Sequence, residues 1–517
     1  MNFFSPTFLI CLFGAVILYY LLPRKLQWVF LLLVSLGFYA MGGWKPLIFL
    51  GFTAFTTFGT GLLLETLNAK AAAARAEGQN AAAPERKKRL ILTLCLVLNF
   101  GLLYVLKYWN FTAEVLTGAG LPDLSISSLL LPLGLSFYMF QSIGYTVDCY
   151  RGKYAAQHNP LKYLLFVSFF PQMVQGPISR YDQLAPQLTG RRSFDAENLR
   201  NGIQLALCGY CKKLLIADRA AVVVKTVFSA PEKYGGFFYA FAVLFYCIQL
   251  YCDFSGGIDI ARGAAQMLGI DLAENFRRPI FAESLADYWR RWHITLGAWM
   301  RDYVFYPLSF SKPLAALGRW SRKRFGGKLG KVIPTACATF VVYLIIGIWH
   351  GANFRYIFFG FYNGVILTAS ILLAQPFSRW RKKLKTDAHP KLMHAFRLLR
   401  TMAIVFVGRY FTRAPRLLVG LRMLKTTLLH PCLYQLGDAT FGTLGLGLQD
   451  YVLVGLGLAV LLLLEHRQEK GLRIREDLAR RNCFVQWLAA AIPLALLVWT
   501  LLMSGSAVDV NLIYQQY

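Results

Sequence analysis

The sequence predicts an all-α, polytopic membrane protein. Of its 517 residues, 56% are hydrophobic and only 16% are charged, and the mean hydropathy is +0.45. A soluble domain is less apolar and interrupts its hydrophobic runs with helix or strand periodicity. Here the apolar runs are long and nearly uncharged, and the basic residues gather in the connections between them. This combination is typical of a chain that crosses a membrane several times.

Eight apolar runs are the candidate membrane helices. Several approach the roughly 20 residues that span a bilayer, and shorter ones would have to tilt or be shielded by neighbouring helices. The first run has no basic segment before it and no small-residue cleavage site after it, so we expect a retained helix rather than a signal peptide. The runs are 8–22, 28–39, 47–64, 90–106, 332–349, 356–374, 451–464 and 485–503.

The basic connections predict the orientation of the chain. By the positive-inside rule, they should face the cytoplasm, which places the N-terminus and the tail after Met503 outside. Because 312–331 and 379–400 would both lie inside, the chain between them must cross the membrane and return. We expect this turn near 351–355, which places His350 toward the outer side. The net charge of +29 is explained by this dispersed pattern, so we do not expect nucleic-acid binding. The basic connections are 70–89, 312–331, 379–400 and 467–481.

Charges and apolar runs do not alternate cleanly in two further stretches, 171–200 and 400–430. We expect re-entrant or interfacial helices there, which are tolerated where they are buried in protein or line a cavity. The alanine-rich stretch 71–84 reads as a cytoplasmic linker. The predicted parts are N-terminal membrane helices with this linker (1–89), a core (90–374), and C-terminal helices with basic loops (375–517).

Two histidines lie in apolar, tryptophan-containing segments. His293 follows Trp292, and His350 follows Trp349. An ionisable side chain at membrane depth is costly and usually marks a functional site, and imidazole can take a proton from a hydroxyl near neutral pH. A hydrogen bond to a neighbouring helix is the alternative. No metal-ligand spacing accompanies either histidine, so no metal site is predicted.

Other polar residues near these histidines are candidate supporting groups. Asp253 and Asp259 flank a Gly-Gly pair in apolar sequence, where they could bind histidine, arginine or backbone amides, although pairing between helices is the simpler role. Asn353 shares a face with His350 only if the helix continues through Gly351. The segment around His293 adds Arg291, which could contact a phosphate-bearing donor or lipid headgroups, Trp292, which could be interface or core packing, and Asp302.

Six segments of the chain together resemble the membrane-bound O-acyltransferase family, in its branch that modifies bacterial polymers by alginate O-acetylation or teichoic acid D-alanylation. The resemblance implies a bowl of many tilted helices around a central funnel, with re-entrant helices. It also matches the family's signature histidine to His350 and its second histidine to His293. One departure is Gly408-Arg-Tyr-Phe-Thr-Arg413, in the region where the alginate branch has a Gly-Trp-Val-Phe-Phe-Arg-like run. The six segments are 131–141, 169–178, 212–218, 251–263, 289–308 and 347–354.

The resemblance implies an enzyme of the cytoplasmic membrane that transfers an acyl group to hydroxyls of an extracellular or cell-wall polysaccharide. Acetyl is the acyl group that we expect. The donor would be acetyl-CoA or an acylated carrier protein, with no bound cofactor. His350 would be the base, while His293 could orient it, relay the proton or hold the donor. A periplasmic or extracellular acyltransferase or esterase-like partner would carry the acyl group onward.

Two other functions stay open. The first is D-alanylation of teichoic acid, with a carrier protein docked on the inner face. The second, from a different class, is a secondary transporter or lipid flippase, which suits broken helices and buried carboxylates. The absence of an internal repeat in the sequence opposes the transporter.

Overall fold

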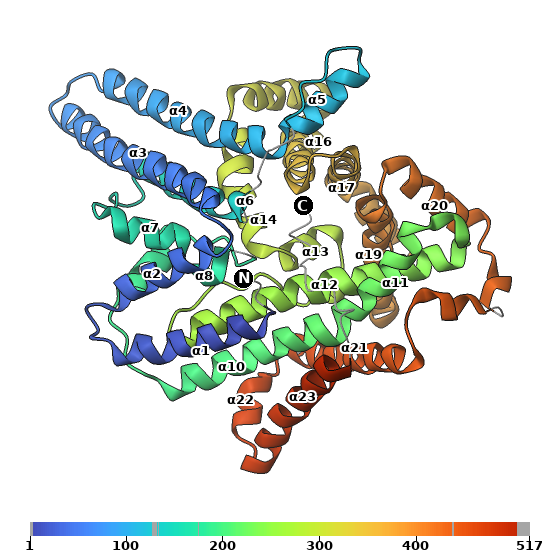
Figure 1. Cartoon of the computed structure of the whole chain (residues 1–517). Helices are drawn as coiled ribbons and strands as arrows, with labels where there is room; N and C mark the ends of the chain where they lie inside the picture. The colour runs from blue at the N-terminus through green and yellow to red at the C-terminus, as the bar shows by residue number, and fades with distance from the viewer. Residues whose placement is uncertain (1–3, 127–131, 133, 174, 437–438, 504–517) are drawn as a thin grey trace. The chain divides into compact units, whose positions relative to one another are not determined.

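A computed structural model describes residues 4–126, 132, 134–173, 175–436 and 439–503. The all-α prediction is confirmed: in this described part the chain forms helices, and its only extended pairing is an isolated bridge between Phe276 and Trp292. The helices are labelled in Figure 1. The chain divides into two compact units, with boundaries within α10 (Ala196–Tyr210), within α12 (Gly236–Met267) and at 273–274. Unit 1 comprises residues 1–206 and 257–273, and unit 2 comprises 207–256 and 274–517.

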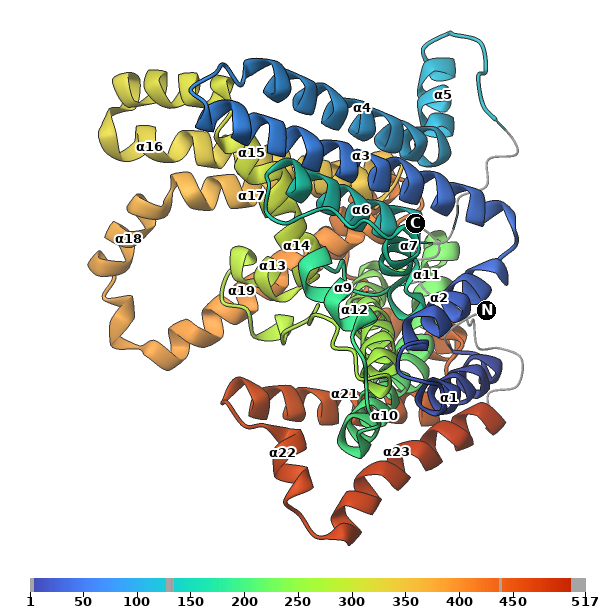
Figure 2. The same cartoon turned by 90° about the vertical axis from the view of Figure 1, so that its left-hand side faces the viewer.

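Unit 1 is built on the long helix α3, which packs against α4 and α6 (Figure 2). Gly61 of α3 allows the close approach of α6, because a Cβ there would lie 2.7 Å from the Tyr145 hydroxyl. The Tyr163 hydroxyl donates to Thr57 of α3 at 2.8 Å, which fixes α7 on the same helix. Its helices are α1 (Pro6–Leu21), α2 (Gln27–Ala40), α3 (Lys45–Ala76), α4 (Ala82–Lys107), α5 (Trp109–Gly118), α6 (Leu135–Tyr150), α7 (Pro160–Ser168), α8 (Phe170–Met173), α9 (Tyr181–Thr189) and most of α10 (Ala196–Tyr210).

Unit 2 holds both predicted histidines. It contains the first part of α12 (Gly236–Met267), and two of its segments, η1 (Cys211–Ala217) and η4 (Arg301–Phe305), are π-helices, a rare form that occurs frequently at functional sites. The other helices are α11 (Asp218–Ser229), α13 (Leu285–Arg291), α14 (Ile294–Met300), α15 (Tyr306–Ser309), α16 (Lys312–His350), α17 (Phe354–Leu372), α18 (Ala374–Lys383), α19 (Pro390–Arg413), α20 (Leu417–Leu429), α21 (Leu448–Glu469), α22 (Ile474–Ala479) and α23 (Cys483–Met503).

Seven of the described helices are long and apolar enough to cross a membrane, namely α3, α4, α12, α16, α17, α21 and α23. The chain is therefore a multi-pass membrane protein. Helix α12 is not among the predicted apolar runs, because Asp253, Asp259 and the glycines between them interrupt its apolar sequence. Within the protein, 61% of the apolar window of α12 is buried, so these polar residues need not face lipid. The first two predicted runs form α1 and α2, which have 16 and 14 residues.

Two predicted connections are more helical than expected. Helix α3 continues to Ala76 and α4 begins at Ala82, because alanine is the best helix former. The basic stretch 312–331 is the first part of α16, and the chain departs from helix at Gly326, where φ is +78°. Gly330 then packs against the backbone of Arg322, since a Cβ there would lie 2.5 Å from the Arg322 Cα.

The stretch 171–200, in its described residues 171–173 and 175–200, contains only short helices and the beginning of α10. Helix α8 has four residues and α9 has nine, so neither can span a bilayer. The stretch 400–430 consists of the end of α19 and the whole of α20, joined at 414–416. Entry of these segments into the bilayer stays a prediction, as does the three-part division of the chain.

Candidate functional site

His293 lies at a sharp turn between α13 and α14. Its backbone is left-handed, with φ 49° and ψ 52°, a conformation that costs a non-glycine residue energy and persists only where its surroundings enforce it. Here the short segment 275–277 supplies that support. The Arg277 amide donates to the Arg291 carbonyl at 2.9 Å, and the Ile294 amide donates to the Asn275 carbonyl at 3.0 Å.

The side chain of Asn275 determines which nitrogen of His293 carries the proton. Asn275 Oδ1 accepts from the Thr295 backbone amide at 3.0 Å and from the Thr295 hydroxyl at 2.9 Å. A backbone amide only donates, so this atom of Asn275 must be the oxygen. His293 Nδ1 lies 3.3 Å from the same oxygen and is therefore the protonated nitrogen of the neutral ring. The lone pair of His293 is then on Nε2.

His293 is buried among aromatic rings. It is 3% exposed, and the Phe254 ring meets it edge to face with centroids 4.9 Å apart. Burial lowers the pKa of His293 to about 3, because desolvation disfavours the charged imidazolium. The ring is therefore neutral at physiological pH and can act as a hydrogen-bond acceptor through Nε2.

His350 is the last residue of α16. Its ring centroid lies 4.9 Å from that of Trp349 and 6.2 Å from that of Phe359. His293 packs on the same tryptophan, with centroids 6.0 Å apart. The structure thus brings the two predicted histidines, 57 positions apart in the chain, to one indole ring.

Asn353 has a local structural role. Helix α16 ends at His350, and Gly351 is extended, with φ 170°, so Asn353 does not share a helical face with His350. Its side chain caps α17, where Oδ1 accepts from the Arg355 amide at 3.1 Å. The capped turn at 351–353 is the one that the charge pattern predicts.

Asp253 pairs with Lys213, which is not among the predicted site residues. The Lys213 ammonium lies 2.6 Å from Asp253 Oδ1 and 2.8 Å from Asp218 Oδ1, and all three side chains are at least nine-tenths buried. The partners predicted for Asp253 are histidine, arginine or backbone amides, whereas the ion pair in the structure is with a lysine. The signal lay in Lys212-Lys-Leu-Leu-Ile-Ala-Asp218, since a lysine in apolar sequence needs a carboxylate. Asp259 lies farther along α12, in the part that belongs to unit 1.

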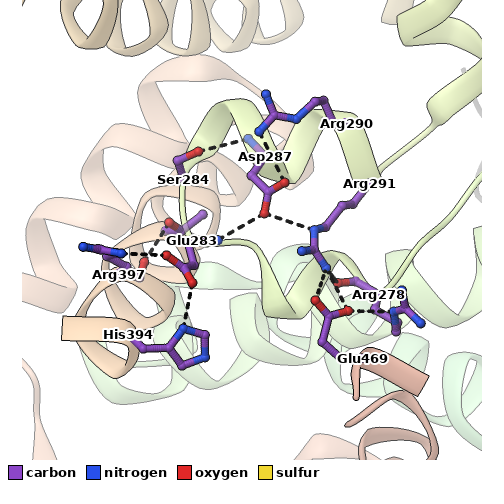
Figure 3. Close-up of polar contacts among 10 residues, drawn as sticks. Arg278, Glu283, Ser284, Asp287, Arg290, Arg291, His394, Arg397 and Glu469 are labelled. Carbon is purple, nitrogen blue, oxygen red and sulfur yellow. Dashed lines mark hydrogen bonds and ion pairs between the residues drawn. The ribbon is translucent and has the colours of Figure 1, made fainter. Parts of the chain in front are cut away.

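Arg291 binds carboxylates of the chain itself (Figure 3). Its Nε lies 3.0 Å from Asp287 Oδ2, and its Nη1 lies 3.0 Å from Glu469 Oε1. Arg278 reaches the same Glu469 carboxylate at 2.8 Å. These pairs tie α13 to the end of α21, and contact of Arg291 with a lipid headgroup or a donor phosphate stays a prediction. Asp302, the last of these candidates, pairs with its neighbour Arg301 at 2.9 Å.

The carboxylate of Glu283 ties the loop before α13 to α19 (Figure 3). It accepts from His394 Nδ1 at 2.8 Å and from Arg397 Nη1 at 3.0 Å. Hydrogen bonds from Arg397 and then from His394 lower the pKa of Glu283. Because the side chains of His394, Glu283 and Arg397 are between 30% and 55% exposed, these ion pairs add little stability and mainly position the loop.

Trp292 packs in the core of unit 2 and is 7% exposed. It stacks on Tyr288 with centroids 5.6 Å apart and an angle of 14° between the rings. The guanidinium carbon of Arg409 lies 5.4 Å from the centroid of Trp292. Core packing, one of the two roles considered for Trp292, is the role that these contacts support.

Comparison with known proteins gives consistent similarities. The model of the membrane-bound O-acyltransferase family matches residues 154–318, which include His293. A probable alginate O-acetylase of Pseudomonas aeruginosa is 32% identical over 413 residues, or 78% of this chain and 70% of the relative. A peptidoglycan O-acetyltransferase of Helicobacter pylori is 30% identical over 66% of this chain and 65% of the relative. A teichoic acid D-alanyltransferase of Bacillus subtilis is 27% identical over 55% of this chain and 67% of the relative.

Proposed function

The chain belongs to the membrane-bound O-acyltransferase family and is a multi-pass membrane O-acyltransferase, and from this premise we propose that it acetylates hydroxyls of an extracellular or cell-wall polysaccharide. Acetyl is the group in the names of the relatives that are at least 30% identical. The proposed location is the cytoplasmic membrane. The proposed donor is the thioester acetyl-CoA, supplied from the inner face, where the basic connections are predicted to lie.

One observation carries the proposal: His293 and His350 pack on the same Trp349 indole. Acyl transfer to an alcohol needs a base for the hydroxyl proton and polar groups for the developing oxyanion. In the proposed reaction, His350 accepts the proton as the hydroxyl oxygen attacks the thioester carbonyl. The C–O bond forms, the C–S bond breaks, and the proton passes from His350 to the leaving thiolate.

We assign His293 a supporting role. Its tautomer, set by Asn275, places the lone pair on Nε2, and its burial keeps the ring uncharged. A neutral acceptor of this kind can hold a hydroxyl or share the proton that His350 receives. A secreted acyltransferase or esterase-like partner is proposed to receive the acetyl group where the polymer lies beyond the membrane.

The experiment compares the cell envelope of a deletion strain complemented with wild type, His350→Ala or His430→Ala. His430 is exposed and lies at the end of α20, so it serves as the matched control. Ester-linked acetyl and ester-linked D-alanine are both measured after mild alkaline release. We expect acetyl to be restored by wild type and His430→Ala but not by His350→Ala.

Other outcomes identify the rivals. Restoration of D-alanine in place of acetyl would reassign the donor to an acylated carrier protein and the acceptor to teichoic acid. If His350→Ala restored the ester fully, the base assignment would be wrong. Dependence of the envelope phenotype on an ion gradient, without His350, would favour the transporter.

A further inference from the structure

Arg409 of α19 is a buried cation in unit 2. It is 6% exposed, and its guanidinium carbon lies 5.4 Å from the ring centroid of Trp292 and 5.5 Å from that of Phe359. Its Nη2 donates to the Tyr288 hydroxyl at 3.1 Å. Within the described residues no carboxylate pairs with Arg409, whereas Arg291 on nearby α13 has two.

This arrangement leaves most of the hydrogen-bonding capacity of Arg409 without a protein acceptor. A guanidinium is always charged and carries five N–H donors, and buried charges are normally paired. The two aromatic rings stabilise the desolvated cation through cation–π contacts. The rings attract the positive charge as a whole. They do not accept hydrogen bonds from the N–H groups, which lie in the plane of the guanidinium. Tyr288 is the one acceptor that the described part of the chain provides.

The position of Arg409 connects it with both histidines. Trp292, on which it packs, is the residue before His293. The Phe359 ring, its second aromatic contact, lies 6.2 Å from the ring of His350. Arg409 is thus linked to His293 through Trp292, the chain neighbour of that histidine, and to His350 through the ring of Phe359.

We propose that Arg409 is a substrate-binding residue that receives a carboxylate or phosphate oxygen of the substrate beside the histidine pair. A planar guanidinium fork binds both kinds of oxyanion in a bidentate way. The anion comes from the thioester donor or from an acidic sugar of the acceptor polysaccharide. This inference rests on the proposed acyl transfer and adds a charge requirement to it.

The test uses membranes of the deletion strain that contain the full chain as wild type, Arg409→Gln, Arg409→Lys or Arg413→Gln. Arg413 is the matched control, because it lies one turn later on α19 and also packs over a ring, that of Phe228, at 5.4 Å. Radiolabelled acetyl-CoA is the donor, and de-esterified envelope polysaccharide from the same strain is the acceptor. Each substrate is varied in turn, and the envelope ester of intact cells is measured in parallel. The melting temperature of each purified variant reports its folding.

Arg409→Gln is expected to raise KM for one substrate about tenfold or more, near the lower limit for losing a charged hydrogen bond. The value of kcat should change much less, and Arg409→Lys should recover part of the loss. A raised KM for acetyl-CoA identifies the donor as the source of the anion, and a raised KM for the polysaccharide identifies the acceptor.

Three results separate the possible failures. If wild type restores no ester in cells and transfers none in membranes, the proposed function itself fails. If wild type is active and both KM values of Arg409→Gln equal those of Arg413→Gln, the anion-binding role is overturned. A loss that appears only in kcat or in melting temperature, without recovery by lysine, would make Arg409 a packing residue and also overturn the inference.

Discussion

The Lys213 ammonium lies 2.6 Å from Asp253 Oδ1, so one buried ion pair joins the π-helix η1 to α12. Burial opposes the charge on Lys213, but Asp253 and then Asp218 outweigh it and raise the pKa of the lysine. The residue after Asp253 is Phe254, whose ring packs against His293. The ion pair therefore holds α12 at the point where it supports the buried histidine.

Replacing Lys213 by methionine should destabilise the protein strongly. The variant leaves two buried carboxylates uncompensated, a defect that costs about 3–5 kcal/mol when one partner of a buried pair is removed. Lys212→Met is the control, since Lys212 is the neighbouring and less buried residue. Thermal unfolding in detergent measures both. The double variant Lys213→Met with Asp253→Asn should recover part of the loss, and equal melting temperatures for the two single variants would contradict the prediction.

Asn275→Ala should reduce acyl transfer more than it reduces stability. The change removes the oxygen that accepts a hydrogen bond from His293 Nδ1. Without this acceptor, the proton of the neutral ring is no longer held on Nδ1. Replacing the residue that orients a metal-ligating histidine typically costs about 10- to 100-fold in activity, and we expect a loss of this order here. Thr295→Val is the matched control, because it removes a hydrogen bond to the same oxygen at 2.9 Å without touching His293. If both variants lost equal activity, the effect would be one of local packing.

The buried state of His293 predicts how stability depends on pH. The pKa is about 3 in the folded protein and about 6.5 for an unperturbed histidine. Between these values the unfolded chain binds the extra proton, so stability rises with pH there, by up to about 1.4 kcal/mol per pH unit, and is flat above. His293→Gln should remove this contribution. Unfolding of wild type and variant is compared between pH 4 and pH 8, and parallel curves would show that His293 does not titrate in this way.

The sequence predicted those features that depend on local composition. The apolar runs predicted the membrane helices α3, α4, α16, α17, α21 and α23. The tryptophan-containing segments marked His293 and His350 as candidates, and their roles stay predictions. The membrane character of α12 could not be read in the same way, because its polar residues are acceptable only once other helices bury them. Alanine-rich and basic stretches were assigned to loops, yet helix propensity extended α3 and α16 into them.

The contact partners of the site residues could not be predicted from the sequence for a different reason. Asn275 and Lys213 act through contacts with residues 18 and 40 positions away, and no periodicity records such pairs. Arg409 looked like a departure from a pattern, and only the fold places it between Trp292 and Phe359. The sequence likewise did not predict the local contacts of Asn353, which caps α17, or of Arg291, which pairs with Glu469.

Gly347→Ala should damage the site from outside it. Gly347 lies on α16, three residues before His350, where α16 and α17 approach closely. A Cβ there would lie 2.5 Å from the Tyr356 carbonyl oxygen and 2.8 Å from the Gly360 Cα. These are backbone atoms that cannot rotate away, so the two helices must separate. Overpacking of this kind typically costs about 1–3 kcal/mol, and it should shift Phe359 and Tyr356 relative to His350.

The control for this variant is Gly455→Ala in α21, where an added Cβ meets nothing within 4 Å. That change should be neutral or slightly stabilising, since glycine inside a helix is less favourable than alanine by about 0.5–1 kcal/mol. Melting temperature and envelope acetyl ester are measured for both variants. We expect only Gly347→Ala to lower the melting temperature and the amount of envelope acetyl ester, because the packing of α16 on α17 positions the rings around His350. Wild-type activity with a lowered melting temperature would show instead that the site tolerates movement of α17, and the rings of Tyr356 and Phe359 would then have no positioning role.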